Sequence, residues 1–433
     1  MRIHPRSIPA KVPGHCRAPG RPSLRTVAAV WTAAAVVAIT GALPVAAGAS
    51  GDSSPAPVPA RTDDGFPVPQ PGREFSFPRD HGSHPDYRIE WWYLTGHLEA
   101  IASTAEAGRE KPDAPPATGR PFGFQVTFFR YAGPLPDGKK TFPAADPLAG
   151  DRQLFSTHVA LADVEGQRFF QAHRLDREGW NATAATDTLQ VRNGPWSLGL
   201  TDPETERMEL VFSTGADSQA HLTLTPQQPL VVFGEDGTSR KGSDPAARSY
   251  YLTFPRLRVA GTLTIDGEEL PVSGSAWMDH EVSSQQLGDD LAGWDWTAIQ
   301  LEDGRSLKAY ILRQEDGTPS AFSRLVWIHP DGTQTAFRPG PDFQWTGLDS
   351  WTSPHTGTTY PSTVRIDTRD PATGDPVTLR LEPRLEDQEV RDPLADNAYY
   401  EGACSVSSSS GLAGLAYLEL VGYGPHGLPG GLR

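Results

Sequence analysis

Sulfur is scarce in this sequence, which has two cysteines and three methionines among 433 residues. Cys16 lies in a basic N-terminal segment, so Cys404 is the one thiol left for the folded part. Internal disulfides and cysteine-rich metal sites are therefore excluded. Stability must come from packed apolar side chains, and the chain is long enough to build two domains.

Positive charge is also in deficit. The 38 Lys and Arg face 53 Asp and Glu, and six of the basic residues precede residue 50, where no acidic residue occurs. Without that segment, 32 basic residues stand against the same 53 acids. A surface so acidic repels nucleic acid and anionic lipid, so both are excluded as partners.

Common catalytic motifs are missing too. The sequence has no His-Glu-x-x-His, no Gly-x-Ser-x-Gly and no glycine-rich phosphate loop. Histidines and acids are available, among them Asp80, His81 and His84, but their spacing fits no metal-ligand pattern. We expect residues 80–84 to form a loop that caps a barrel. We therefore predict no metal and no cofactor, and a hydrolase is the least favoured enzyme class.

The N-terminus has the pattern of a secretory signal. Basic residues precede the apolar run Val27–Leu43 and the small-residue cleavage site Ala47-Gly48-Ala49. We predict a signal peptide over 1–49, secretion, and no stable membrane insertion once it is cleaved. An uncleaved membrane anchor is the alternative, because the apolar run is slightly long. Residues 50–73 are rich in Pro, Ala, Ser and Gly and are expected to form a disordered linker.

Long amphipathic helices are absent from the remaining sequence, which 41 prolines and 43 glycines interrupt throughout the chain. Between these breakers lie short runs rich in β-branched and aromatic residues. In 257–265 apolar residues alternate with polar ones, as in a half-buried strand. Dipeptides such as Asp266-Gly267 and Asp303-Gly304 fit hairpin turns. The pattern predicts an all-β fold of antiparallel barrels or sandwiches.

A faint internal repeat favours two domains. The Trp-rich segments Trp91–Leu98 and Trp294–Leu301 each stand near the start of a β-rich block. The acid-rich stretch Ser283–Asp290 would connect the blocks. We predict an N-terminal domain over 74–285 and a C-terminal domain over 286–425.

The first cluster that could carry chemistry is Glu90-Trp91-Trp92-Tyr93. In a strand, Glu90 and Trp92 share one face while Trp91 and Tyr93 share the other. A carboxyl group placed beside a Trp and away from water has a raised pKa and can donate a proton near neutral pH. The structural alternative is a core of Trp side chains in which Glu90 binds backbone groups or an arginine such as Arg130.

The second cluster is Trp277-Met278-Asp279-His280-Glu281, at the end of a strand-like segment. Trp277, Asp279 and Glu281 would share one face. An acid beside an aromatic ring suits alkene chemistry, because the acid protonates a double bond and the ring stabilises the resulting carbocation. The alternative is a polar network that anchors a loop. For this cluster the functional interpretation is favoured.

Both clusters belong to a set of motifs that spans residues 74–424 and resembles the AttH-like secreted proteins related to carotenoid 1,2-hydratases. The motifs are long and specific. They are Asp80-His81-Gly82, Glu90-Trp91-Trp92-Tyr93-x-Thr95-Gly96, Phe122-Gly123-Phe124-Gln125-x-Thr127-Phe128-Phe129-Arg130, His158-Val159-Ala160-Leu161-x-Asp163, Gly274-x-Ala276 followed by the second cluster, Trp294-Asp295-Trp296, Tyr400-Glu401-Gly402-Ala403 and Gly414-x-Ala416-Tyr417-Leu418-Glu419-Leu420-x-Gly422-Tyr423.

The resemblance implies two tandem lipocalin-like antiparallel β-barrels packed against each other, with a site in or between them. Some members of this group add water to the terminal double bond of acyclic carotenoids without a cofactor, and others are similar to fungal enzymes that cyclise polyenes. In the hydratase branch the proposed proton donor matches Asp279. That branch has a Tyr-containing motif where this chain has Trp277-Met278, so a carotenoid substrate does not follow from the resemblance.

We therefore expect a secreted lipocalin-like protein that acts on an apolar unsaturated small molecule, as a carotenoid 1,2-hydratase-like lyase or a related cofactor-independent isomerase or cyclase. Asp279 would donate the proton, with Glu90 or His280 as its partner. The alternative is a non-catalytic carrier of hydrophobic ligands. The side chains expected to bind the substrate are Trp92, Tyr93, Gln125, His158, Trp277, Glu281, Trp294 and Trp296.

Overall fold

The computed structural model describes residues 57–101, 119–132, 153–216, 218–288, 290–392 and 397–424. The predicted signal peptide and the first part of the predicted linker lie outside the described residues. Residues 57–73 of that linker contain buried apolar side chains, among them Phe66 and Val68, which are 4% and 1% exposed. Packed structure therefore begins before residue 74.

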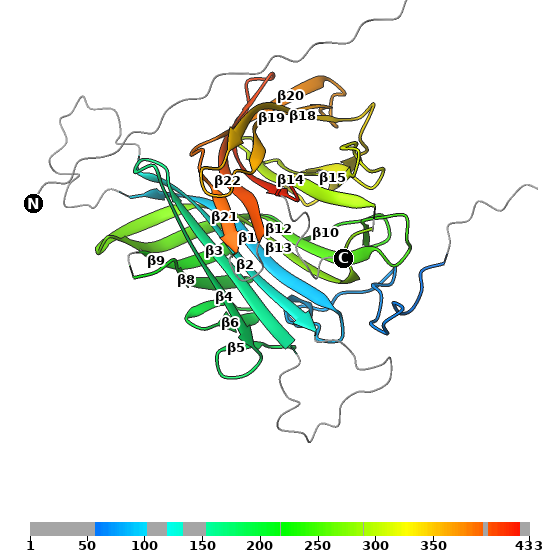
Figure 1. Cartoon of the computed structure of the whole chain (residues 1–433), viewed down its shortest axis with the longest axis horizontal. Coiled ribbons are helices and arrows are strands. Elements are labelled where there is room, and N and C mark those ends of the chain that lie inside the picture. The colour runs from blue at the N-terminus through cyan, green and yellow to red at the C-terminus, as the bar shows by residue number, and fades with distance from the viewer. Residues whose placement is uncertain are drawn as a thin grey trace, which may run out of the picture. The chain divides into compact units, whose positions relative to one another are not determined.

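The prediction of an all-β fold is confirmed. Among the described residues the one helix is the short 3-10 helix η1 (Arg79–His81), and none is long and apolar enough to cross a membrane. The strands form two antiparallel sheets, coloured from blue to green and from yellow-green to red in Figure 1. Both sheets are curled, as in the lipocalin-like fold.

The first sheet has the strand order β4-β3-β2-β1-β13-β12-β9-β8-β7-β6-β5, and β10 and β11 both pair with β12. The strand bounds are β1 Ile89–Ala100, β2 Pro121–Ala132, β3 Gln153–Asp163, β4 Arg168–Arg177, β5 Ala182–Ala184, β6 Gln190–Asn193, β7 Trp196–Asp202, β8 Arg207–Ser213, β9 Ser218–Pro226, β10 Val231–Val232, β11 Ser239–Arg240, β12 Arg248–Ile265 and β13 Glu268–Gln285.

The second sheet has the order β17-β16-β15-β14-β23-β22-β20-β19-β18, and β21 pairs with β22. The strand bounds are β14 Leu291–Leu301, β15 Ser306–Gln314, β16 Arg324–Ile328, β17 Gln334–Phe337, β18 Gln344–Thr352, β19 Thr359–Arg369, β20 Pro376–Pro383, β21 Glu389–Asp392, β22 Asn397–Ser408 and β23 Ala413–Val421.

A predicted hairpin turn joins the two longest strands. Asp266 and Gly267 have φ angles of 53° and 81°, and Ile265 pairs with Glu268 across them. Two consecutive residues with positive φ match the right-handed twist of a strand pair, and a glycine adopts this conformation without strain. The turn fixes the register of β12 and β13 as far as Leu257 and Ala276, and a bulge then shifts it before the second cluster, where Thr253 pairs with Asp279.

The interior of the first sheet is solidly packed. Its fully buried side chains include Trp92, Phe122, Phe124 and Phe128, which belong to one apolar cluster with residues of β8, β9 and β12. The sheet curls until the side-chain amide of Asn193, on β6, donates to the backbone oxygen of Phe155, on β3, at 3.2 Å. The curled first sheet therefore encloses a filled core.

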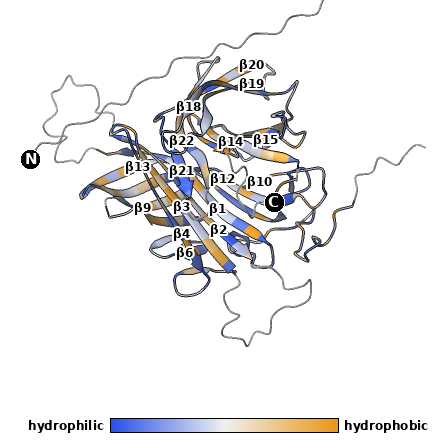
Figure 2. Ribbon diagram, in the orientation of Figure 1, coloured by the Kyte–Doolittle hydropathy of each residue, from blue (hydrophilic) through white to orange (hydrophobic). Residues whose placement is uncertain are grey.

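Strands β1 and β2 and the second half of β13 are buried on both faces. One face contributes to the core of the first sheet, and the other meets β14, β22 and β23 of the second sheet. Hydrophobic and hydrophilic residues are consequently mixed along these strands (Figure 2). The chain passes from the first sheet to the second between β13 and β14, and both sheets belong to one compact unit. The predicted division into two domains stays a prediction.

Candidate functional site

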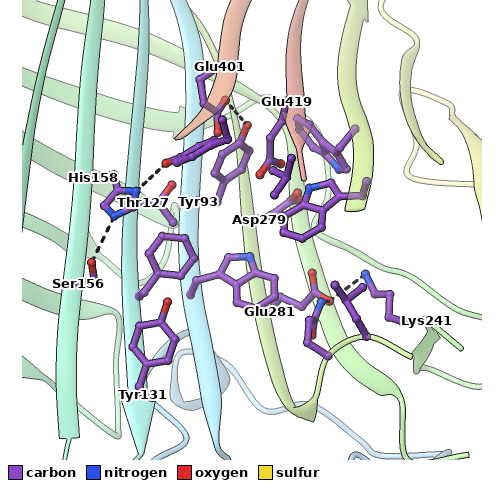
Figure 3. A pocket seen from close by; sticks show the side chains of 18 of the residues that line it. Tyr93, Thr127, Tyr131, Ser156, His158, Lys241, Asp279, Glu281, Glu401 and Glu419 are labelled. Carbon is purple, nitrogen blue, oxygen red and sulfur yellow. Dashed lines mark hydrogen bonds and ion pairs between the residues drawn. The ribbon is translucent and has the colours of Figure 1, made fainter. Parts of the chain in front are cut away.

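A cavity of about 460 Å³ lies between the outer face of the first sheet and the second sheet (Figure 3). Most of its walls are aromatic or aliphatic, and a smaller set of polar groups points inward. Small-molecule sites in proteins have this size and composition. The lining side chains are Arg88, Trp91, Tyr93, Thr127, Phe129, Tyr131, Ala132, Leu154, Ser156, His158, Leu175, Lys241, Tyr251, Asp279, Glu281, Gln286, Leu287, Trp294, Trp296, Tyr310, Leu312, Asp392, Tyr399, Glu401, Glu419 and Val421.

The register of β1 and β13 decides which residues reach this cavity. Tyr93 pairs with Asp279, and Trp91 pairs with Glu281. Because side chains alternate along a strand, these four share the face toward the second sheet. The alternate residues, among them Glu90, point to the interior of the first sheet.

Asp279 is the central acid of the cavity. Its oxygens accept hydrogen bonds from the Tyr251 hydroxyl at 2.6 Å, from Trp277 Nε1 at 2.8 Å and from the Thr253 hydroxyl. Burial raises the pKa of Asp279 to about 6, against the opposing effects of nearby Lys308 and of the three donors. The carboxyl group can therefore exchange a proton near neutral pH.

An ion pair lies beside this acid. Lys241 Nζ is 3.0 Å from a Glu281 oxygen, and the Gln286 amide donates to the same oxygen at 2.8 Å. The ammonium group also lies 4.7 Å from the centre of the Tyr251 ring. Figure 3 shows Glu281 and Lys241 below Asp279 on the same wall. The Glu281 carboxylate of this ion pair lines the cavity, where it can accept a hydrogen bond or a proton from a ligand.

Two further acids come from the second sheet. Glu401 on β22 pairs directly with Glu419 on β23, and both line the cavity. Burial raises the pKa of Glu419 to about 8 and that of Glu401 well above its usual range, where the charge of Glu419 adds to the effect. Tyr93 donates to Glu401 Oε2 at 3.0 Å. Near neutral pH these acids are proton donors rather than anions.

The opposite end of the cavity is lined by His158. Its Nδ1 atom lies 2.6 Å from the Tyr399 hydroxyl, and Nε2 lies 3.3 Å from the Ser156 hydroxyl. Trp294, Trp296 and Leu312 supply apolar walls. The cavity thus has polar groups near both His158 and Asp279, together with apolar walls.

Glu90 lies in a buried polar network away from the cavity. Its oxygens lie 2.9 Å from Arg130 Nε, His84 Nδ1 and His280 Nε2, and the Ser83 hydroxyl donates to it at 2.9 Å. The histidine hydrogen bonds and the Arg130 charge hold its pKa well below the usual range although burial opposes them. Glu90 is fully buried in this network and is not among the lining residues. The contact with Arg130 is the one that the structural alternative expects.

The predicted partnership of Asp279 with Glu90 or His280 is not seen, because Asp279 and these two residues lie on opposite faces of the same strand pair. Trp92 is also on the interior face, where it stacks on His280 at 4.9 Å. Gln125 donates to Thr127 but does not line the cavity. Of the other predicted binding residues, Trp277 packs against Trp296, and the lining includes Tyr93, His158, Glu281, Trp294 and Trp296.

Sequence reasoning did not select Tyr251, Lys241, Glu401 or Glu419 as site residues. Glu401 and Glu419 stand within the motifs that carry the family resemblance, so a signal for them was present. Tyr251 and Lys241 stand in segments without such a motif. They reach Asp279 and Glu281 because β12 pairs with β13 and because the loop after β11 approaches the cavity.

Comparison with known proteins agrees with this architecture. A solved structure described as a putative AttH from Nitrosomonas europaea is 32% identical to this chain, with a TM-score of 0.67 over 82% of this chain and 98% of the other. Kievitone hydratase from Nectria haematococca has a TM-score of 0.55 over 84% and 95% of the two chains. At 15% identity the hydratase supports the fold alone.

Two curated relatives are ceramide-binding proteins called svf1. The protein from Aspergillus fumigatus is 32% identical over 144 residues, which are 32% of this chain and 35% of the relative. The protein from Schizosaccharomyces pombe is 24% identical over 169 residues, which are 37% of this chain and 43% of the relative. The matches therefore span less than half the length of these relatives. A family model described as AttH-like covers residues 68–423, and the chain belongs to the AttH-like family.

Proposed function

We propose that the protein binds an apolar, unsaturated small molecule in the cavity between its two sheets and transforms it by acid catalysis, with Asp279 as the proton donor. The observation that carries this proposal is the buried carboxyl group of Asp279, whose pKa of about 6 leaves it partly protonated near neutral pH in a mostly apolar cavity. No cofactor takes part in the proposed steps.

In the proposed reaction, the O–H bond of Asp279 breaks as the π electrons of a double bond form a new C–H bond. The substrate becomes a carbocation and Asp279 a carboxylate. Tyr251, Thr253 and Trp277 donate to this carboxylate and stabilise its charge. The faces of Trp294 and Trp296 would stabilise the cation, an effect of about 2 kcal/mol when the site excludes water.

Three outcomes are open to such a cation. Water addition gives a hydratase, proton loss from the neighbouring carbon gives an isomerase, and attack by a second double bond followed by proton loss from the new cation gives a cyclase. All three need an acceptor for a proton. Glu281 replaces Glu90 in this role because it lines the cavity and lies two residues from Asp279 on the same strand face.

The proposal is tested by separating binding from turnover. Purified protein is incubated with an acyclic polyene, an unsaturated fatty acid and a ceramide, and binding is followed by tryptophan fluorescence while products are followed by mass spectrometry. Asp279→Asn should retain binding and lose turnover by about 10²–10⁴-fold, the usual contribution of a general acid. Turnover by the wild type should fall as the pH rises above about 6, because Asp279 loses its proton.

Asp295→Asn is the matched control. Burial also raises the pKa of Asp295 to about 6, yet this acid binds Arg313 and Tyr423 and is not a lining residue. Its substitution should leave turnover unchanged within about threefold. Equal turnover by wild type and Asp279→Asn would contradict the assignment of the proton donor.

A second candidate function is that of a carrier for hydrophobic molecules, which the names of the ceramide-binding relatives favour. A carrier would bind the same ligand equally well as wild type and as Asp279→Asn, and neither would convert it. Loss of turnover with retained binding would rule this second function out.

We further propose that the protein is exported. The test is N-terminal sequencing of the protein recovered outside the cell, which should begin near residue 50.

A further inference from the structure

Two histidines and a carboxylate meet at the end of the cavity that lies away from Asp279. His158 on β3 pairs directly with His173 on β4, so both rings lie on the same face of the first sheet, with centroids 4.7 Å apart. Asp392, at the end of β21 in the second sheet, approaches them. One potential ligand atom from each residue lies within 4.8 Å of the other two.

The separations fit a metal ion. His158 Nε2 and Asp392 Oδ2 are 3.3 Å apart. Zinc binds such nitrogen and oxygen atoms at about 2.0–2.2 Å, so two ligands at a tetrahedral angle stand roughly 3.4 Å apart. His158 and Asp392 therefore already have the spacing of two ligands of one ion. The ligand atom of His173 lies within 4.8 Å of the other two.

One ring nitrogen of each histidine, Nδ1 of His158 and Nε2 of His173, has a hydrogen-bond partner that orients the ring. His158 Nδ1 lies 2.6 Å from the Tyr399 hydroxyl, while Nε2 faces both Asp392 Oδ2 and the Ser156 hydroxyl at 3.3 Å. His173 Nε2 lies 3.3 Å from Gln171 Oε1, while His173 Nδ1 is buried and has no hydrogen-bond partner among the described residues. Metal-binding histidines are held in this way, with one nitrogen fixed by a neighbour and the other left for the ion.

A second group of similar composition is built around a buried arginine. His84, Glu90 and His280 also lie within 4.8 Å of one another in the described part of the chain. There the carboxylate is paired with the Arg130 guanidinium at 2.9 Å and accepts further hydrogen bonds from Ser83 and His84. A cation would have to displace a buried arginine charge from that group, so it carries no metal proposal.

We propose that His158, His173 and Asp392 bind one divalent transition-metal ion with the ligand preference of Zn²⁺. His158 and Asp392 line the cavity, so a remaining coordination position faces the bound small molecule. Three protein ligands with one open position are the arrangement of catalytic and substrate-binding zinc sites rather than of structural ones. The ion would hold a hydroxyl or carbonyl oxygen of the ligand at the end away from Asp279.

The same ion would link the two sheets, because its histidines belong to the first sheet and its carboxylate to the second. Strands β4 and β21 already make polar contacts. The side-chain amide of Gln171 donates to the backbone carbonyl of Glu389 at 3.1 Å, and the backbone N–H of Arg391 donates to Gln171 Oε1 at 2.7 Å. Metal binding to the folded state alone raises the unfolding temperature. Zn²⁺ should therefore stabilise the protein against heat.

The test uses the full chain, stripped with a chelator and titrated with Co²⁺, whose visible absorption reports its coordination. The wild type should bind one Co²⁺ per chain, give the bands of a tetrahedral or five-coordinate site and lose them on addition of Zn²⁺. His173→Ala and Asp392→Asn should each weaken Co²⁺ binding by at least tenfold and abolish the increase in unfolding temperature with Zn²⁺. His221→Ala, which removes an exposed histidine, should change neither.

His173→Cys protects the test against variants that fail to fold. This variant keeps a metal ligand at position 173, so it should bind Co²⁺ and add a thiolate-to-cobalt absorption band that the wild type lacks. A wild type that takes up no Co²⁺ would overturn the proposal. So would Co²⁺ uptake that is the same in the wild type, His173→Ala and Asp392→Asn, because the ion would then be bound elsewhere on the protein.

Discussion

The two faces of the β1–β13 strand pair carry acids of opposite character. On the interior face, Glu90 is surrounded by Arg130, His84 and His280, and these partners hold its pKa well below the usual range. On the cavity face, Asp279 has hydroxyl and indole donors, and burial raises its pKa to about 6. The two acids lie on the same pair of strands and are both buried.

The difference shows that burial alone does not make a carboxyl group a proton donor. Full burial opposes ionisation of both acids, but an adjacent guanidinium and two imidazoles outweigh it at Glu90. At Asp279, nearby Lys308 and three neutral hydrogen-bond donors together do not outweigh it. An acid that is ion-paired on all sides supports the fold, whereas an acid whose hydrogen-bond donors are neutral can exchange protons with a ligand in a cavity.

Substitution of Glu90 should produce the largest change in stability. Glu90→Gln leaves the Arg130 guanidinium buried without its counter-charge, and such a loss costs about 3–5 kcal/mol of the free energy of unfolding. Urea denaturation of wild type and variant measures the change. Ligand affinity of the folded fraction should stay the same, because Glu90 does not line the cavity.

Asp279→Asn is the comparison for this experiment, since it should lose turnover while its stability changes by less than that of Glu90→Gln. The opposite pattern, in which Glu90→Gln folds normally and loses turnover, would reverse the roles that we assign to the two faces.

A smaller effect is expected from Glu419 on the pH dependence of stability. Its pKa is about 8 in the folded protein and near 4.5 when unfolded, so between these values the folded state binds one more proton than the unfolded state. The free energy of unfolding therefore falls as the pH rises through this window. From pH 7 to pH 8 this one group should lower it by about 1 kcal/mol.

Glu419→Gln removes this titration and should flatten the dependence between pH 7 and pH 8 by that amount. Urea midpoints at the two values measure it in wild type and variant. A wild type whose stability is constant or increases over this range would show that Glu419 is ionised in the folded protein, as Glu90 is.

Much of the fold could be predicted from the sequence because its signals are local. Alternating residues and turn dipeptides such as Asp266-Gly267 indicated antiparallel strands, and the alternation placed Glu90 and Trp92 opposite Trp91 and Tyr93. Alternation could not say which face meets the second sheet. That depends on the packing of β14, β22 and β23 against β1 and β2, which joins segments some 300 residues apart, as in the hydrogen bond from Tyr93 to Glu401.

The dependence on packing between distant segments also explains why some side chains of the candidate site could not be predicted from the sequence. Asp279 and Glu281 were found because they stand beside Trp277 in one short motif. Tyr251 and Lys241 lie on other segments and reach the site only through strand pairing and loop packing. The sequence likewise gives no reason to group His173 and Asp392 with His158, since strand pairing joins His173 to His158 and the packing of the second sheet brings Asp392 to them.

The central claim is that the ligand lies between the two sheets and contacts Asp279, while the interior of the first sheet is a filled core. A crystal structure of the protein with the small molecule it carries, identified beforehand by native mass spectrometry, tests this claim most directly. The account predicts electron density for the molecule between Trp294, Trp296 and Asp279. Density inside the first sheet, beside Trp92 and Glu90, would contradict it.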